Sequence, residues 1–87
     1  MAQIEVESIG ARRFRVHIRD GAVETSHLVS VPERPEFEGE DTERPLRASF
    51  EFLLEREPPS SILAGFELSD IARYFPDYWD ELARRLK

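Results

Sequence analysis

The chain has 87 residues, of which 40% are hydrophobic and 34% are charged, and its formal net charge is −6. This length suffices for one domain with a modest core but leaves little room for a deep, walled active site. No cysteine is present, which excludes disulfide bonds, a thiol nucleophile and thiolate metal ligands.

The negative charge is concentrated in one segment. Residues 33–43 hold six acidic residues and one arginine, a net charge of −5, whereas acids and bases nearly balance elsewhere. This distribution argues against a nucleic-acid partner, which normally meets a basic patch. No basic leader and no apolar stretch of about 20 residues is present, so we expect a cytoplasmic protein without a membrane partner.

Three segments in the first third alternate apolar and polar residues, which is the period of a half-buried strand. They cover residues 3–9, 12–19 and 23–31. We therefore predict a three-stranded antiparallel meander with one apolar and one charged face, in which the first and third strands form the two edges.

The turn residues predict the register of both hairpins. A loop centred on Gly10 places Val6 opposite Phe14. At Asp20–Gly21 we predict a two-residue type I′ turn, which needs positive φ at both positions. This turn places His27 of the third strand opposite Phe14 of the second.

The second half of the chain changes to helical periodicity. After an acidic loop, apolar residues recur at helical spacing from Pro45 and predict a helix that runs to about Glu57. Phe52 lies off the apolar stripe, so we expect it to pack against later helices. Further helical segments are predicted at residues 61–64, at residues 70–75 and from residue 78 onward.

These elements predict an α+β fold, in which a three-stranded antiparallel meander has one face covered by C-terminal helices in a two-layer sandwich. The whole chain, 1–87, forms a single domain. It consists of a meander at 1–31, an acidic loop at 32–44 and a helical part at 45–87. The acidic loop is long for a compact domain, so we expect it to be either mobile or functional.

A basic row lies on the charged face of the second predicted strand and consists of Arg13, Arg15, His17 and Arg19. Alternate residues on a strand stand about 6.5–7 Å apart, close to the phosphate spacing of a nucleic-acid strand. Nucleic-acid association through this row is therefore an alternative function. The competing interpretation is that glutamates on neighbouring strands neutralise the row: Glu5 facing Arg15, Glu7 facing Arg13, and Glu24 facing His17. No aromatic residue accompanies the row to stack a base.

The two histidines lie on opposite faces of the predicted sheet, so His17 and His27 cannot share a metal ion or a proton. No metal-ligand spacing and no Gly-x-Ser-x-Gly elbow occurs. We therefore predict a protein that is not an enzyme and that needs neither a metal nor another cofactor. A small hydrolase or binding protein that uses His27 is a third class, and it requires His27 to line an open pocket.

Two further segments have both a functional and a structural interpretation. The acidic run 33–43 fits a divalent cation or a basic partner, but it lacks EF-hand spacing and equally fits a solvated loop. Leu68–Phe75 resembles the second helix of a helix-turn-helix. Pro76 and the acidic residues after it replace the glycine turn, however, and carboxylates there would repel phosphates.

Aromatic residues are dense towards the carboxyl terminus: Phe66, Tyr74, Phe75, Tyr78 and Trp79. One interpretation is that they form the core beneath the sheet. The other is that Tyr74, Tyr78 and Trp79 form a partly exposed patch that anchors a partner, because Tyr and Trp dominate interface hot spots. The second interpretation makes the chain a protein-interaction module that binds an unidentified protein or a second copy of itself.

The helical half carries a string of apolar anchors, caps and prolines: residues 49–58 (SFEFLLEREP), Ser61-Ile62-Leu63, Phe66-x-Leu68, Ile71 and Tyr74-Phe75-Pro76-x-Tyr78. Together with the preceding strand hairpin, this string resembles a family of small uncharacterised bacterial proteins. The resemblance implies an α+β fold and a bacterial origin, and it carries no catalytic or ligand-binding residue across.

Overall fold

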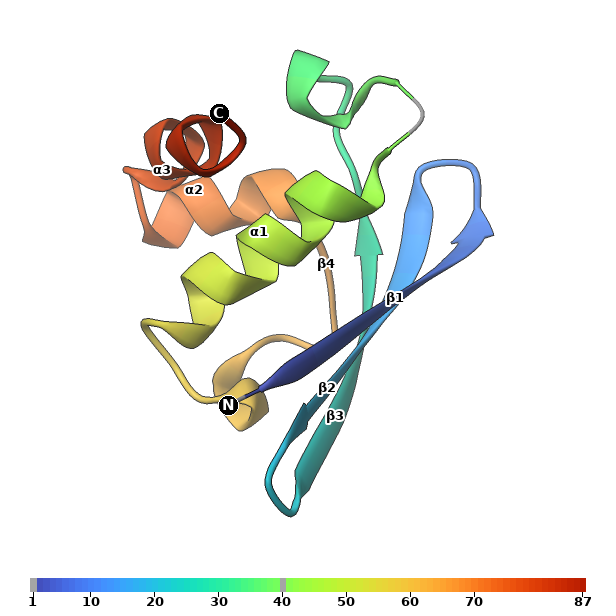
Figure 1. Ribbon diagram of the computed structural model, residues 1–87, viewed down its shortest axis with the longest axis vertical. Coiled ribbons are helices and arrows are strands. Elements are labelled where there is room, and N and C mark those ends of the chain that lie inside the picture. Colours follow the sequence, from blue (N-terminus) through green and yellow to red (C-terminus); the bar gives the residue numbers. More distant parts are fainter. Residues whose placement is uncertain (1, 40) are drawn as a thin grey trace.

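The computed structural model describes residues 2–39 and 41–87, and it places a four-stranded sheet against a layer of helices (Figure 1). The arrangement confirms the predicted α+β fold, and its first three strands form the antiparallel meander. Met1 of the predicted meander lies outside the described residues. The elements are β1 Gln3–Gly10, β2 Arg13–Asp20, β3 Val23–Ser30, η1 Pro35–Phe37, α1 Glu43–Leu54, η2 Pro59–Ser61, β4 Gly65–Glu67, η3 Leu68–Asp70, α2 Ile71–Tyr74 and α3 Tyr78–Arg85.

A fourth strand, which the sequence analysis did not predict, extends the meander. β4 lies beside β3 and runs parallel to it, with Phe66 opposite Val29. The prediction that β3 is a free edge is therefore wrong, because β4 occupies part of that edge. β1 forms the opposite edge of the sheet. With only three residues, β4 is too short to show an alternating pattern.

Both hairpin registers differ from the predicted ones by two residues. Val6 pairs with Val16 instead of Phe14, and Val16 in turn pairs with His27. Because side chains alternate with a period of two, a shift of two residues leaves every side chain on its predicted face. The apolar and charged faces are therefore as predicted, while the individual cross-strand partners are not.

Turn geometry explains the shift. In the second hairpin Asp20 stays in the strand opposite Val23, and the turn residues are Gly21 and Ala22. Of these two, Gly21 alone has positive φ, at 63°, so the predicted type I′ turn is wrong. In the first hairpin the pairing is irregular between Ser8 and Gly10, and the chain turns one step later than predicted.

α1 packs between β1 and α3 and supplies much of the core. Its predicted apolar stripe is buried at Leu46, Phe50 and Leu53. The ring centroid of Phe52 lies 5.9 Å from that of Phe75 and 5.4 Å from that of Tyr78. This confirms that Phe52 packs against the later helices, and α1 is consequently buried on two sides.

The helical segments are shorter and more broken than predicted. α1 ends at Leu54 and not near residue 57, and the turn predicted at 61–64 is replaced by η2. The segment predicted at 70–75 consists of η3 followed by the four-residue α2. Proline lacks a backbone N–H and fixes φ, so Pro59 starts a new turn instead of continuing α1.

The acidic segment is tied to the core by Phe37. This side chain, at the end of η1, is buried and meets the Trp79 ring edge-on with 6.5 Å between centroids. The Arg34 guanidinium stacks 3.7 Å above the Trp79 ring and donates hydrogen bonds to Glu36. Glu40 of the predicted acidic loop lies outside the described residues.

Candidate interaction surface

An open groove lies between the end of α1, the segment around η2 and the short helix α2. Its apolar lining consists of Leu53, Ile62, Leu63, Phe66, Ile71, Tyr74 and Phe75. The volume of the groove is about 300 Å³. Two of the apolar side chains remain open to solvent, because Tyr74 is 70% exposed and Leu63 is 55% exposed. The groove is therefore an apolar surface that the fold itself does not cover.

The local sequence explains why this segment leaves a groove. Pro58 and Pro59 end the helical path after α1, and Ile62 is the only buried residue among the four that follow Pro59. A reciprocal capping box between Glu67 and Asp70 then starts η3 and leads into α2. Short turns with few buried anchors span this part of the surface, and they leave the neighbouring apolar side chains uncovered.

His27 fixes the wall of the groove from inside the core. It is 2% exposed, its Nδ1 lies 2.7 Å from the carbonyl oxygen of Leu63, and its Nε2 lies 2.9 Å from Thr25 Oγ1. Because a carbonyl only accepts, Nδ1 carries the hydrogen and donates it. The ring also packs against Phe50, with 5.7 Å between centroids. His27 does not line an open pocket, so the condition that the hydrolase hypothesis required is not met.

The three predicted partner-binding residues differ in how far they are exposed to solvent. Tyr74 lies at the groove with most of its side chain exposed. Tyr78 is completely buried, so its assignment to an exposed patch is corrected: the residue belongs to the core. Trp79 is partly buried beneath Arg34 and beside Phe37. Only Tyr74 of the three therefore presents a largely free aromatic surface.

Sequence reasoning missed three residues of this surface: Leu63, Glu57 and Asp70. In the sequence, Leu63 belongs to the string of apolar anchors, and Asp70 is the first residue of the helical segment predicted at 70–75. Exposure is inferred from sequence through periodicity, and an irregular segment has no period from which the outward side chains can be identified. No local signal distinguishes them.

A buried hydrogen-bond chain holds Tyr78. The Tyr78 hydroxyl lies 2.6 Å from Ser49 Oγ, and Ser49 in turn donates to the carbonyl oxygen of Pro45 at 2.8 Å. Because the Ser49 hydroxyl donates its hydrogen to the carbonyl of Pro45, the Tyr78 hydroxyl is the donor in the hydrogen bond between Tyr78 and Ser49. Burial raises the pKa of the Tyr78 hydroxyl well above its ordinary value of 10.0, although the hydrogen bond with Ser49 opposes this rise.

The buried tyrosine predicts alkaline sensitivity. The folded state disfavours the phenolate, so the stabilisation is complete below pH 10 and is lost as pH rises above 10 towards the folded-state pKa. Between pH 8 and pH 11 the free energy of unfolding is expected to fall by about 1 kcal/mol more for the wild type than for Tyr78→Phe. Urea denaturation at both pH values measures the difference, and equal losses in the two proteins would contradict the assignment.

The basic row lies on the outer face of the sheet with acidic partners beside it. Arg15 pairs with Glu7 at 2.8 Å, which replaces the predicted Glu7–Arg13 and Glu5–Arg15 pairs because of the altered register. Arg19 and His17 both contact Glu24 at 3.1 Å, as predicted for His17. The hydrogen bonds from His17 and then Arg19 lower the pKa of Glu24, so it stays ionised.

Arg13 is the member of the row that forms no ion pair within the described residues. The other members share two glutamates, so much of their charge is balanced locally. A row of this kind offers a phosphate backbone less net attraction than the same row without its acidic partners would. The arrangement supports the interpretation of a solvated outer face.

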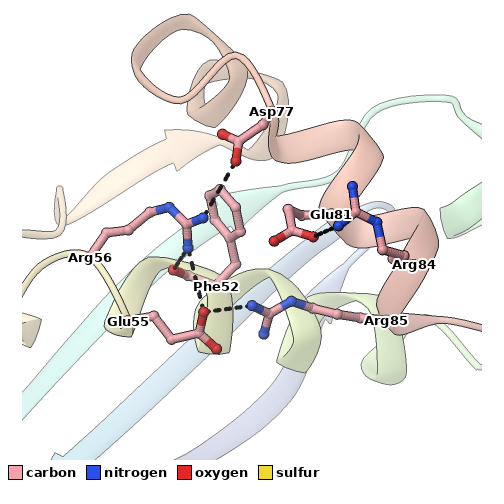
Figure 2. A network of polar contacts seen from close by, with 7 residues as sticks. All are labelled: Phe52, Glu55, Arg56, Asp77, Glu81, Arg84 and Arg85. Carbon is pink, nitrogen blue, oxygen red and sulfur yellow. Dashed lines mark hydrogen bonds and ion pairs between the residues drawn. The ribbon is translucent and has the colours of Figure 1, made fainter.

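A polar network joins the end of α1 to α3 (Figure 2). The Arg56 guanidinium lies 3.6 Å from the centroid of the Phe52 ring and contacts Glu55 and Asp77, each at 3.5 Å. Glu55 also accepts a hydrogen bond from Arg85 at 2.6 Å, which is the main cause of its lowered pKa. These solvent-accessible pairs each contribute little to stability, and together they form a polar link between the end of α1 and α3.

The remaining site predictions concern metals, membranes and DNA. Within residues 2–39 and 41–87, no group of three or more histidine, aspartate or glutamate side chains is placed to hold a metal ion. No helix in the described part of the chain has the length and apolarity to cross a membrane. The segment that resembles a helix-turn-helix contains η3 and the four-residue α2, and the next helix, α3, begins with the buried Tyr78. The first residue of α3 therefore faces the core, whereas the start of a recognition helix faces the DNA bases.

Comparison with known proteins adds no functional assignment. No family model, curated protein or solved structure matches this chain.

Proposed function

We propose that this chain is a small cytoplasmic, non-enzymatic protein-interaction module and that its binding surface is the groove beside Tyr74. The observation that carries this proposal is the exposure of Tyr74 and Leu63, two large apolar side chains, at the mouth of an apolar groove. Tyrosine commonly anchors interfaces, because its ring is largely apolar and its hydroxyl remains able to form hydrogen bonds.

The groove is held in shape before any partner arrives. Its floor includes Leu53 and Ile71, which are buried in the core, and its wall at Leu63 is held by the hydrogen bond from His27. A surface that is already ordered loses little conformational entropy on binding.

Capture from a host lysate tests the proposal with three baits: the wild type, Tyr74→Ala and the control Val23→Ala. Val23 is also an exposed apolar residue, but it does not line the groove. We expect at least one protein to bind the wild type and Val23→Ala, and to bind Tyr74→Ala at least tenfold more weakly when purified, because a hot-spot truncation costs about 2 kcal/mol or more.

Retention of every captured protein by Tyr74→Ala would contradict the groove as the binding surface. Equal loss with Tyr74→Ala and Val23→Ala would also contradict it, because the binding would then depend on exposed apolar area in general. Circular dichroism of the three baits establishes that each is folded before the comparison is made.

A further inference from the structure

We infer that the groove beside Tyr74 receives a segment of a partner protein that carries a large apolar side chain flanked by lysine or arginine. This inference rests on the proposed function and adds the chemical class of the partner. It is carried by the charges at the groove: two carboxylates line it, from Glu57 and Asp70, and none of the lining residues is basic.

Neither carboxylate is neutralised by the chain itself. Glu57 and Asp70 are both half-buried, and neither forms an ion pair within the described residues. One oxygen of Asp70 accepts the backbone N–H of Glu67 at 3.3 Å, which leaves the other oxygen free. A half-buried carboxylate beside an apolar wall attracts a cation more strongly than a carboxylate on an open surface does, because less water screens the pair.

The arginine nearest to Glu57 in sequence is engaged elsewhere. Arg56 precedes Glu57, but its guanidinium stacks on Phe52 and reaches towards Glu55 and Asp77 (Figure 2). The carboxylate of Glu57 is therefore available to a partner.

The size of the groove favours a side-chain anchor over a cofactor or metabolite. Its volume of about 300 Å³ lies at the lower limit of small-molecule sites, which span about 300–1,000 Å³. It is also open on one side, so a ligand without attached chain would bury only part of its surface. An apolar side chain on a longer segment fills it and gains further contacts along the rim.

A second copy of this chain is a poor occupant. Each copy carries a formal charge of −6, so two copies repel each other. Two of the three basic residues at the carboxyl end are already engaged, because Arg84 pairs with Glu81 and Arg85 pairs with Glu55. A basic, apolar segment of another protein satisfies both the groove and the carboxylates.

A random dodecapeptide library displayed on phage supplies the probe. It is selected against the intact wild-type chain after depletion against Tyr74→Ala, and enriched peptides are synthesised with a fluorescent label. We expect them to share an aromatic or aliphatic anchor with lysine or arginine nearby, and to bind more weakly as salt is raised. Enrichment of neutral or acidic peptides, or no enrichment, would overturn the inference.

The variant E57Q/D70N removes both charges and keeps the side-chain shapes, and the asparagine oxygen still accepts the Glu67 N–H. Its affinity for the selected peptide is expected to fall about tenfold. The matched control, E38Q/D80N, removes two exposed acids that do not line the groove and is expected to change affinity less than twofold.

The outcomes separate the two proposals. Loss of binding in Tyr74→Ala with full binding in E57Q/D70N supports the groove and overturns the basic partner. Failure of any peptide to enrich overturns the proposed function as well, because every peptide that survives depletion against Tyr74→Ala must depend on Tyr74. A concentration-dependent dimer in gel filtration that Tyr74→Ala abolishes would identify a second copy as the occupant and overturn the inference.

Discussion

Replacing Phe52 with alanine is expected to lower the free energy of unfolding by about 3–5 kcal/mol. The Phe52 ring is 1% exposed and sits where α1 meets the C-terminal helices. Alanine would leave a cavity between Phe75 and Tyr78, and rings that are held in place on other sides can close only part of it.

The substitution also removes the ring on which Arg56, a member of the polar network between α1 and α3, stacks. Arg56 stacks on the Phe52 ring at 3.6 Å and, through the same guanidinium, reaches Asp77. Without the ring the guanidinium loses its cation–π contact, which is worth about 0.5–1 kcal/mol at a partly exposed site. The loss should therefore fall in the upper part of the range for a phenylalanine truncation.

Urea denaturation followed by circular dichroism measures this effect, with Tyr74→Ala as the control. Tyr74 is a mostly exposed aromatic side chain on a neighbouring helix, so its truncation is expected to cost less than about 1 kcal/mol. If Phe52→Ala does not fold, Phe52→Leu provides the measurement, at an expected cost of about 1–2 kcal/mol. A cost below 1 kcal/mol for Phe52→Ala would show that this ring does not join the helices.

Sequence periodicity was sufficient to predict the two layers and most of the core. The alternation in the first third places Val16 and Ile18 on the buried face, and both are completely buried. The position of Phe52 off the stripe of α1 correctly predicted a second contact face. These features depend on a repeat that extends over many residues, which is the kind of information a single sequence contains.

The register and the fourth strand depend on turn conformation and on tertiary pairing, which the apolar pattern does not encode. Moving a strand by two residues leaves the apolar pattern unchanged, so the pattern could not distinguish the observed pairing of Val6 with Val16 from the predicted one. Turn conformation decides between them. β4 forms because its backbone pairs with β3, and its three residues carry no sequence pattern that would predict a strand.

The candidate site was predicted only in part for the same reason. Tyr74 and Tyr78 stand on either side of Pro76, in short helices whose orientation is set by tertiary packing. One is 70% exposed and the other is completely buried, yet no local feature of the sequence separates them. Of the patch predicted at Tyr74, Tyr78 and Trp79, only Tyr74 is largely exposed, and Leu63 with the segment around it supplies the rest of the surface.

His27 provides the second large expected effect: His27→Phe should lower the free energy of unfolding by about 2–3 kcal/mol. Phenylalanine has a similar size and can keep the contact with Phe50, but it cannot bond the carbonyl of Leu63 or the hydroxyl of Thr25. Each of these groups then loses its partner at the edge of the core, where a missing hydrogen bond costs about 1–3 kcal/mol.

His17→Phe is the matched control, because it makes the same chemical change on the opposite face of the adjacent strand. The His17 ring contacts Ser26 and Glu24 at the surface, where water can replace both bonds, so its loss is expected to cost less than about 1 kcal/mol. Amide hydrogen exchange gives a local measurement for His27→Phe. The N–H of Leu28 donates to the carbonyl of Ala64 at 2.8 Å, beside the lost bond, and should exchange faster. Equal destabilisation by the two histidine variants would show that the bond to Leu63 does not anchor the groove wall.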